Sequence, residues 1–146
     1  MSVLFSRQCE YALQSVMYLA LKPPGERTSI RELTRKMDIP YHFLAKILQD
    51  LTYKGFLVSQ KGPTGGFALG KSPKEITLLD IVEAIDGMGF TTSCVLGFPE
   101  CSGKNPCAVH QKWGEMRDSL RETLAKRNIA EMAMEMKKPE YRSAVA

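Results

Sequence analysis

Three cysteines and a histidine lie close together in the second half of this sequence. Cys94, Cys101 and Cys107 are separated by six and then five residues, and His110 follows three residues after the last of them. Thiolates are the soft ligands that hold iron–sulfur clusters or zinc in proteins. Structural zinc sites usually contain cysteine pairs with about two to four residues between them. This segment has no such pair, so the spacing favours an iron–sulfur cluster.

Other interpretations of these residues stay open. Three unconnected buried cysteines are one alternative, although a glycine-rich loop offers few buried positions. Zinc binding and a thiol redox switch are two others, since exposed cysteines with a low pKa act as sensors. His110 lies one helical turn beyond Cys107 and can therefore reach the same metal. A single histidine near the start of a helix is, however, often an ordinary surface residue.

Residues suited to DNA contact occur in the first half of the chain. A helix expected between Pro40 and Gly55 has an apolar stripe on one face and polar side chains on the other. A shorter helix precedes it, opened by a capping-box pattern at Ser29 and Glu32, so the pair predicts a helix-turn-helix. The second helix of such a motif meets base edges. The candidate DNA-contacting residues on it are Tyr41, His42, Lys46 and Gln49.

A glycine-rich hairpin follows this motif directly. Two short strands are expected at 56–60 and 67–69, joined by residues 61–66, which include three glycines. A hairpin in this position is typical of the wing of a winged helix, which enters the minor groove or meets phosphate. The candidate contacts are Lys61, Gly62 and Thr64 in the hairpin and Arg31, Arg35 and Lys36 in the preceding helix.

Further helices must position these two groups. Amphipathic helices are expected at 7–21, where Cys9 should pack inward, and at 77–87. The three cysteines then fall in a long loop, 88–106, which precedes a last helix of about six turns. Apolar residues recur along this helix at spacings of 4, 3, 4 and 4, as in a coiled-coil seam. The sequence therefore predicts a homodimer through Val109, Trp113, Met116, Leu120 and Leu124.

Composition excludes several classes of protein. The chain has 146 residues, of which 44% are hydrophobic and 25% charged, a balance that is typical of a globular domain rather than a disordered segment. The net charge of +4 is a mild bias toward polyanionic partners. The first residues lack the pattern of a signal peptide, and no apolar run reaches membrane-spanning length, so we expect a cytoplasmic protein without a membrane partner.

Enzymatic activity is not expected. The sequence has no phosphate-binding loop and no Ser/His/Asp set, and it contains only two histidines. We therefore expect no small-molecule substrate. An iron–sulfur electron carrier is a less favoured alternative to a DNA-binding regulator. In a reducing cytoplasm, four cysteines indicate metal or redox chemistry before they indicate disulfides.

Taken together, these features resemble the Rrf2 family of bacterial winged-helix transcriptional regulators. The resemblance covers nearly the whole chain and includes the three-cysteine loop before a long helix. It implies a homodimer that binds pseudo-palindromic DNA operators and carries an iron–sulfur cluster on the three loop cysteines. The segments that carry it are CEYAL at 9–13, IPY at 39–41, FLAKIL at 43–48, KGP at 61–63 and GGF at 65–67.

The resemblance also bears on the fourth ligand and the signal. Family members with a [2Fe-2S] cluster use a histidine, whose place His110 matches, and this favours [2Fe-2S] over [4Fe-4S]. Other members use a carboxylate from the first helix of the partner subunit, whose place Glu10 matches. The implied function is a repressor that senses iron–sulfur status, redox or nitrosative stress. Some relatives lack a cluster, so a cluster-free thiol- or ligand-sensing regulator stays the alternative.

The expected fold is mainly α, a winged helix-turn-helix with a small β-hairpin wing and a long C-terminal dimerisation helix. Residues 1–87 should form the DNA-binding domain and 88–106 the cluster loop. Residues 107–136 should form the dimerisation helix region, and 137–146 a flexible tail. A change at the cluster would reorder the loop and shift the spacing of the two recognition helices.

Overall fold

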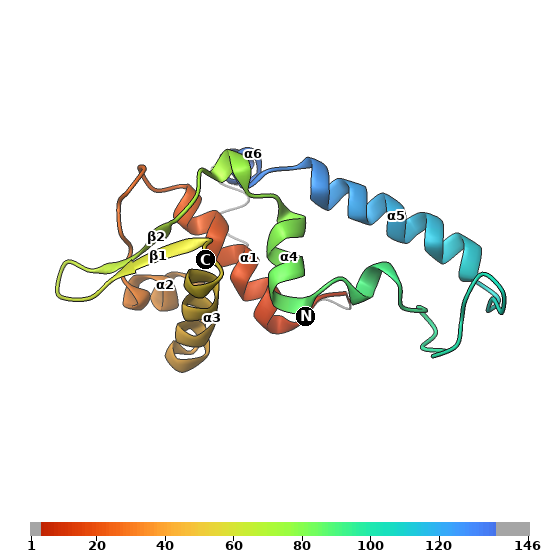
Figure 1. Cartoon of the computed structure of the whole chain (residues 1–146). Helices are drawn as coiled ribbons and strands as arrows, with labels where there is room; N and C mark the ends of the chain where they lie inside the picture. The colour runs from red at the N-terminus through yellow and green to blue at the C-terminus, as the bar shows by residue number, and fades with distance from the viewer. Residues whose placement is uncertain (1–3, 137–146) are drawn as a thin grey trace.

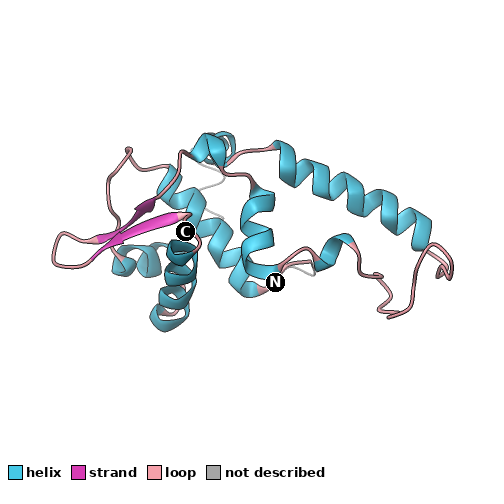
Figure 2. Ribbon diagram, in the orientation of Figure 1, coloured by secondary structure: helices cyan, strands magenta, loops and turns pink. Residues whose placement is uncertain are grey.

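The computed structural model describes residues 4–136, which form a helical molecule with one small hairpin (Figures 1 and 2). The expected tail at 137–146 lies outside these residues. Within them, no helix combines the length and the apolar character that a membrane crossing requires. The elements are α1 (Arg7–Ala20), α2 (Ile30–Met37), α3 (Tyr41–Tyr53), β1 (Leu57–Gln60), β2 (Gly66–Leu69), η1 (Pro73–Glu75), α4 (Leu78–Asp86), η2 (Gly89–Thr91), α5 (His110–Lys126) and α6 (Ile129–Glu135).

The helix-turn-helix consists of α2 and α3. The Ser29 hydroxyl caps α2 by accepting a hydrogen bond from the Glu32 amide at 3.2 Å. The Glu32 carboxylate pairs instead with Lys22 Nζ at 3.3 Å, so the capping pattern is only half realised. Asp38 ends α2 in the left-handed conformation, with φ of 53°, which turns the chain into α3. The next residue, Ile39, is buried and anchors that turn in the core.

The wing is an antiparallel pair of β1 and β2, with Leu57 opposite Leu69. Thr28, from the connection between α1 and α2, adds a short bridge in which it and Phe67 exchange two backbone hydrogen bonds of 2.8 Å. Gly66 is required at this contact, because a Cβ there would lie 2.4 Å from the Thr28 carbonyl oxygen. The hairpin is therefore held to the helix-turn-helix by its backbone.

The core surrounds α1, which packs against α3, α4 and α6. Apolar residues at helical spacing on these elements are removed from water, which supplies the main driving force for the fold. Cys9 lies in this core, as expected, and is fully buried. The largest fully buried apolar side chains are Leu33, Leu44, Leu48, Leu51, Leu57, Ile76, Ile81 and Ile129.

The region expected to be one long helical segment is divided in two. α5 ends at Lys126 after 17 residues, about five turns rather than six. Arg127 is extended, and Asn128 caps α6 by accepting from the Glu131 amide at 2.9 Å. α6 then returns to α1 and buries Ile129 and Ala133. The sequence predicts no separate helix here, yet α6 completes the core of the winged unit.

α5 and the cysteine loop give the molecule its elongated shape. Figure 1 shows α5 extending away from the other helices, with the loop returning beneath it to α4. The junction of α5 with α6 is tied to the start of α4 by a bridge between Thr77 and Asn128. A hydrogen bond of 2.7 Å from the Ile129 amide to the Ile76 carbonyl reinforces it. The cysteine loop thus lies at the far end of a helix whose other end is anchored in the core.

Candidate metal centre and DNA-binding surface

Two tight turns fold the cysteine loop onto itself. In the first, the Gly97 amide donates to the Cys94 carbonyl at 3.0 Å, and Gly97 has a φ of 83°. In the second, Ser102 and Asn105 exchange backbone hydrogen bonds of 3.2 and 3.1 Å. The first turn follows Cys94 and the second lies between Cys101 and Cys107, so the chain reverses direction twice within this segment.

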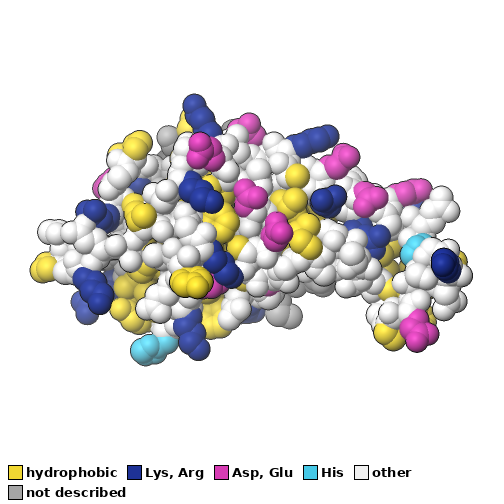
Figure 3. Space-filling view, in the orientation of Figure 1, with side chains coloured by type: hydrophobic (Ala, Val, Ile, Leu, Met, Phe, Trp, Pro, Cys, Tyr) yellow, Lys and Arg dark blue, Asp and Glu magenta, His cyan; other side chains and the backbone are white. Residues whose placement is uncertain are grey.

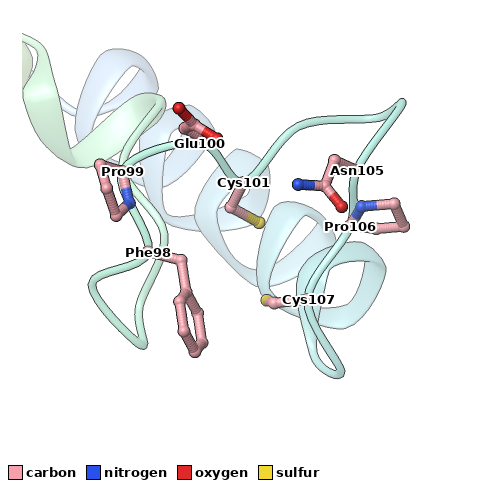
Figure 4. A pocket seen from close by; sticks show the side chains of 7 residues that line it. All are labelled: Phe98, Pro99, Glu100, Cys101, Asn105, Pro106 and Cys107. Carbon is pink, nitrogen blue, oxygen red and sulfur yellow. The ribbon is translucent and has the colours of Figure 1, made fainter.

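The result is that the three thiols converge. The sulfur atoms of Cys94, Cys101 and Cys107 all lie within 4.8 Å of one another. Cys94 Sγ and Cys107 Sγ are 3.6 Å apart, and Cys101 Sγ is 3.2 Å from His110 Nδ1. Figure 4 shows the Cys101 and Cys107 side chains directed toward each other, whereas Glu100 points away from the sulfurs.

This donor set fits a metal centre. Two thiolates bound to one tetrahedral ion with bonds of about 2.3 Å lie about 3.8 Å apart, close to the separation of Cys94 and Cys107. His110 begins α5 and presents a ring nitrogen to the remaining cysteine. Three soft thiolates and one imidazole are suitable ligands for an iron–sulfur cluster or for zinc. The four donors form two close pairs, Cys94 with Cys107 and Cys101 with His110.

The thiols differ in acidity. Partial burial raises the pKa of Cys94, but the backbone N–H groups of Phe98 and Leu96 and the two neighbouring thiols outweigh it and lower that pKa to about 7. The backbone N–H of Cys107 lowers the pKa of Cys101. Burial and the thiols of Cys107 and Cys94 outweigh this effect, so the pKa of Cys101 is raised. A lowered thiol pKa favours metal binding, because the ligand is the thiolate.

The alternative fourth ligand, Glu10, lies in the first turn of α1 and is half-buried. In Figure 1 the cysteine-bearing end of the loop and the start of α5 lie away from α1 of the same chain, although the loop begins beside α1, where Phe90 contacts Phe5. Among the described residues, Glu10 is not part of the group of donors that converges at the three thiols. Within its own chain, the Glu10 charge acts on Cys9, whose pKa is raised to about 12 by burial first, then by Asp86 and Glu10.

The expected dimer seam does not form one exposed stripe. Leu124 is buried in the core of its own chain, and Leu120 is half-buried against that core. Trp113 faces the cysteine loop, where its indole N–H donates to the Ser93 carbonyl at 2.9 Å. Val109 and Met116 are the exposed members of the set. The apolar spacing along α5 thus reflects packing against α4 and the loop as well as any partner.

The cavity at the thiols also includes residues that the sequence analysis missed. It has a volume of about 210 Å³ and is lined by the three cysteines, His110, Trp113 and Arg117, among others. Arg117 Nη1 donates to the same Ser93 carbonyl at 3.4 Å. The available signal was spacing, because Arg117 lies seven residues after His110 and therefore on the same helix face.

The candidate DNA-binding residues gather at the opposite end of the molecule. Tyr41, His42, Lys46 and Gln49 are all exposed on α3, while its apolar face is buried. A groove of about 380 Å³ lies between α3 and the wing, and Gln49, Lys61 and Gly62 line it together. The structure therefore places Gln49 of the predicted helix at the same groove as Lys61 and Gly62 of the wing.

Basic side chains mark the same end. Arg31, Arg35 and Lys36 on α2 are exposed, as is Thr64 in the wing. On the face shown in Figure 3, Lys and Arg predominate over the winged end, whereas Asp and Glu gather over the middle of the molecule and along α5. This distribution suits a phosphate backbone at the winged end.

The chain has a helix-turn-helix with a wing at one end and a group of thiols at the far end of α5. This combination is typical of a winged-helix DNA-binding regulator. Residues 5–135 match Rrf2, the family of iron-dependent transcriptional regulators, and the chain belongs to this family. It is thus a DNA-binding transcriptional regulator and not an enzyme.

Relatives and solved structures agree with this assignment. A protein of Aquifex aeolicus (strain VF5) that is named as an HTH-type transcriptional regulator is 37% identical to this chain over 122 residues. The match covers 82% of this chain and 84% of the relative. The HTH-type transcriptional regulator IscR of Cronobacter sakazakii is 26% identical, covering 75% and 67%.

Two solved structures share the fold. CymR of B. subtilis, the global cysteine regulator, superposes with a TM-score of 0.77 at 24% identity and covers 91% of this chain and 98% of that one. T. potens IscR has a TM-score of 0.69 at 21% identity and covers 92% and 88%. The predicted winged fold with a C-terminal helix is confirmed.

Proposed function

We propose that this regulator binds operator DNA as a homodimer and responds to an iron–sulfur cluster held by Cys94, Cys101 and Cys107, with His110 as the fourth ligand. The observation that carries the proposal is the convergence of these four donors at the free end of α5. The winged helix supplies DNA binding at the other end of the same chain. A single chain thereby joins a metal-responsive group to a DNA-binding surface.

The pairing of the donors supports a [2Fe-2S] cluster over a mononuclear ion. Two ligands for each of two irons is the arrangement that such a cluster needs, and Cys94 with Cys107 and Cys101 with His110 provide it. When bound, the cluster supplies a group that oxidants or nitric oxide can change or remove. The imidazole of His110, as a neutral ligand, would raise the reduction potential relative to a fourth thiolate.

The protein residues connect this site to the DNA surface through α5 and α4. Ligands on both sides of the loop would fix its two turns, so loss of the metal would free the segment between Cys94 and Cys107, which contains both turns. α5 packs on α4, and α4 packs on α1 in the winged unit. The change acts as a switch only if DNA binds the two states with different affinities.

An absorption spectrum with iron and sulfide analysis of anaerobically purified protein tests the proposal. We expect a coloured protein with about two iron and two sulfide ions per chain. Gel-shift assays on genomic fragments, with cluster-loaded and metal-free protein, should then give different affinities. A colourless protein that contains one zinc ion per chain would contradict the cluster assignment and leave DNA binding intact.

One observation favours a second candidate, a cluster-free thiol switch. Cys94 Sγ and Cys107 Sγ are 3.6 Å apart, and the pKa of Cys94 is about 7. Hydrogen peroxide could oxidise this pair to a disulfide, with release of two water molecules for each peroxide consumed and disulfide formed. In that case peroxide would change operator affinity in protein that never contained iron, and Cys107→Ser would abolish the response.

A further inference from the structure

Two side chains of α5 converge on a single backbone carbonyl beside the thiols. Trp113 Nε1 donates to the Ser93 oxygen at 2.9 Å, and Arg117 Nη1 donates to the same oxygen at 3.4 Å. Ser93 directly precedes Cys94. The two donors therefore hold the backbone from which the first thiol projects.

These contacts join the two branches of the site. Cys107 lies just before α5 and His110 begins it, so α5 itself positions these two donors. Cys94 arrives on the other branch, after η2, where the Ser93 amide donates to the Gly89 carbonyl at 2.8 Å. Trp113 and Arg117 are three and seven residues after His110, so all three share one helix face directed at this branch.

Arg117 carries a second indication of a role at the site. Its Nε is buried and has no hydrogen-bond partner within residues 4–136. A buried donor without an acceptor is uncommon, because it loses its hydration without compensation. Arg117 also lines the cavity that contains the three cysteines. A negatively charged centre bound in that cavity would lie beside the Arg117 guanidinium.

We propose that Trp113 and Arg117 are positioning residues of the metal centre, which clamp the Ser93 carbonyl against α5 and thereby hold Cys94 at Cys107 before any metal binds. The inference rests on the proposed metal centre and assigns this site two residues beyond its ligands. Without the clamp, the branch that carries Cys94 would have to be ordered during binding, and the lost conformational entropy would weaken the affinity.

Cobalt titration of metal-free protein measures this effect, with Co²⁺ alone as the probe and thiolate-to-cobalt absorption as the signal. Trp113→Phe keeps the aromatic ring and removes the donor, and Arg117→Gln removes the guanidinium. We expect each to weaken Co²⁺ binding about three- to tenfold, the effect of one hydrogen bond. Arg117→Lys should recover part of the loss, because it keeps a charged donor. Arg121→Gln, an exposed arginine one turn further along α5, is the matched control and should bind as the wild type does.

Far-UV circular dichroism and operator affinity of the metal-free variants should equal those of the wild type, since the clamp lies outside the winged unit. Unchanged cobalt affinity in both Trp113→Phe and Arg117→Gln would overturn the proposal. Equal weakening by Arg121→Gln would overturn it too, because the effect would then belong to α5 in general.

A second measurement needs no metal and separates this proposal from the proposed function. Diamide removes two electrons and two protons from a pair of thiols and leaves one disulfide. In metal-free protein, the Cys94–Cys107 disulfide should form several times more slowly in Trp113→Phe and Arg117→Gln than in the wild type. If the purified protein contains no iron but the variants form the disulfide more slowly than the wild type, the clamp is supported and the cluster proposal is contradicted. If the protein contains iron but the variants match the wild type in oxidation rate and in Co²⁺ affinity, only the clamp proposal is contradicted.

Discussion

Cys9 and Cys94 are the extremes among the thiols of this chain. Cys9 is fully buried in α1, with its pKa raised to about 12, chiefly by that burial. Cys94 is half-buried in a loop, and backbone N–H donors overcome the effect of its burial and lower its pKa to about 7. Only a thiolate reacts readily, so the two residues should differ greatly in reactivity.

We expect iodoacetamide to alkylate Cys94 in metal-free protein near pH 7.5, while Cys9 stays unmodified. Below pH 7 the reaction at Cys94 should slow about tenfold for each further pH unit, because its thiolate fraction falls as pH drops through its pKa. Mass spectrometry of the labelled peptides measures both. Denatured protein, in which all four cysteines should react, is the control. Rapid labelling of Cys9 in folded protein would contradict the assignment.

The identity of the fourth ligand is testable by two substitutions. His110→Ala should shift or bleach the visible absorption of the loaded protein, because His110 Nδ1 lies 3.2 Å from Cys101 Sγ. Glu10→Ala should leave that spectrum unchanged, and Ala at any of the three cysteines should abolish it. The reverse pattern, with Glu10 essential and His110 silent, would mean that Glu10 of the partner subunit closes the site.

The metal-site candidates could be predicted at the residue level because their chemistry is local. The candidate ligands are three thiols and a histidine that all lie within 17 residues, so the sequence identifies them without any knowledge of the loop geometry. The clamp could not be predicted, since its acceptor is the backbone carbonyl of Ser93, which no residue type identifies. The spacing predicts Trp113 in a dimer seam, because an apolar residue at this interval has the same pattern whether it faces a partner helix or the loop of its own chain.

Among the elements, the wing has the most direct consequence for DNA. Lys61 lines the groove beside α3, together with Gln49. Lys61→Ala should lower operator affinity and reduce the slope of log K against log salt by about one, the effect of one lost phosphate contact. Lys74→Ala, outside the wing in η1, is the control and should keep the wild-type slope. An unchanged slope in Lys61→Ala would show that Lys61 does not neutralise a phosphate.

α6 should contribute to stability out of proportion to its seven residues. Ile129 is fully buried and joins the core cluster around α1, so Ile129→Ala should lower the free energy of unfolding by about 2–5 kcal/mol. Met134→Ala, on the exposed side of the same helix, should change it by less than about 0.5 kcal/mol. Urea denaturation compares them. Similar small effects would mean that α6 does not pack as described.

The helix-turn-helix and the wing were predictable because their signals are local: periodicity, caps and a glycine-rich turn. The packing of α5 and α6 was not. Periodicity along α5 shows which face is apolar but not what covers it, and the structure places Leu124 against its own core. α6 is too short for a clear period, and its pairing with Ile76 across more than 50 residues is a tertiary contact.

At the scale of the whole molecule, the packing of α5 decides which of its residues can be substituted to test for a dimer. Leu120 is half-buried against the core of its own chain, so an acidic residue there would disturb folding itself. Met116, with 57% of its surface exposed, is free of this difficulty. Met116→Asp should convert a dimer to monomers in analytical ultracentrifugation, because it would bury a charge in the interface.

Ala125→Asp is the matched control, since Ala125 is exposed nine residues later and hence on the opposite side of α5. It should stay dimeric. A dimeric Met116→Asp protein, or a monomeric Ala125→Asp protein, would place the interface elsewhere.

The anchored junction at Thr77 and Asn128 makes α5 a lever arm. Its 17 residues span about 25 Å, so a rotation of about 5° at the junction displaces the thiol end by about 2 Å. In the opposite direction, a displacement of the thiols reaches the winged unit as a small change of angle, reduced in amplitude. The same rotation would move each recognition helix by an amount proportional to its distance from the junction. The spacing between the two DNA half-sites that a dimer can bind would change by a corresponding amount.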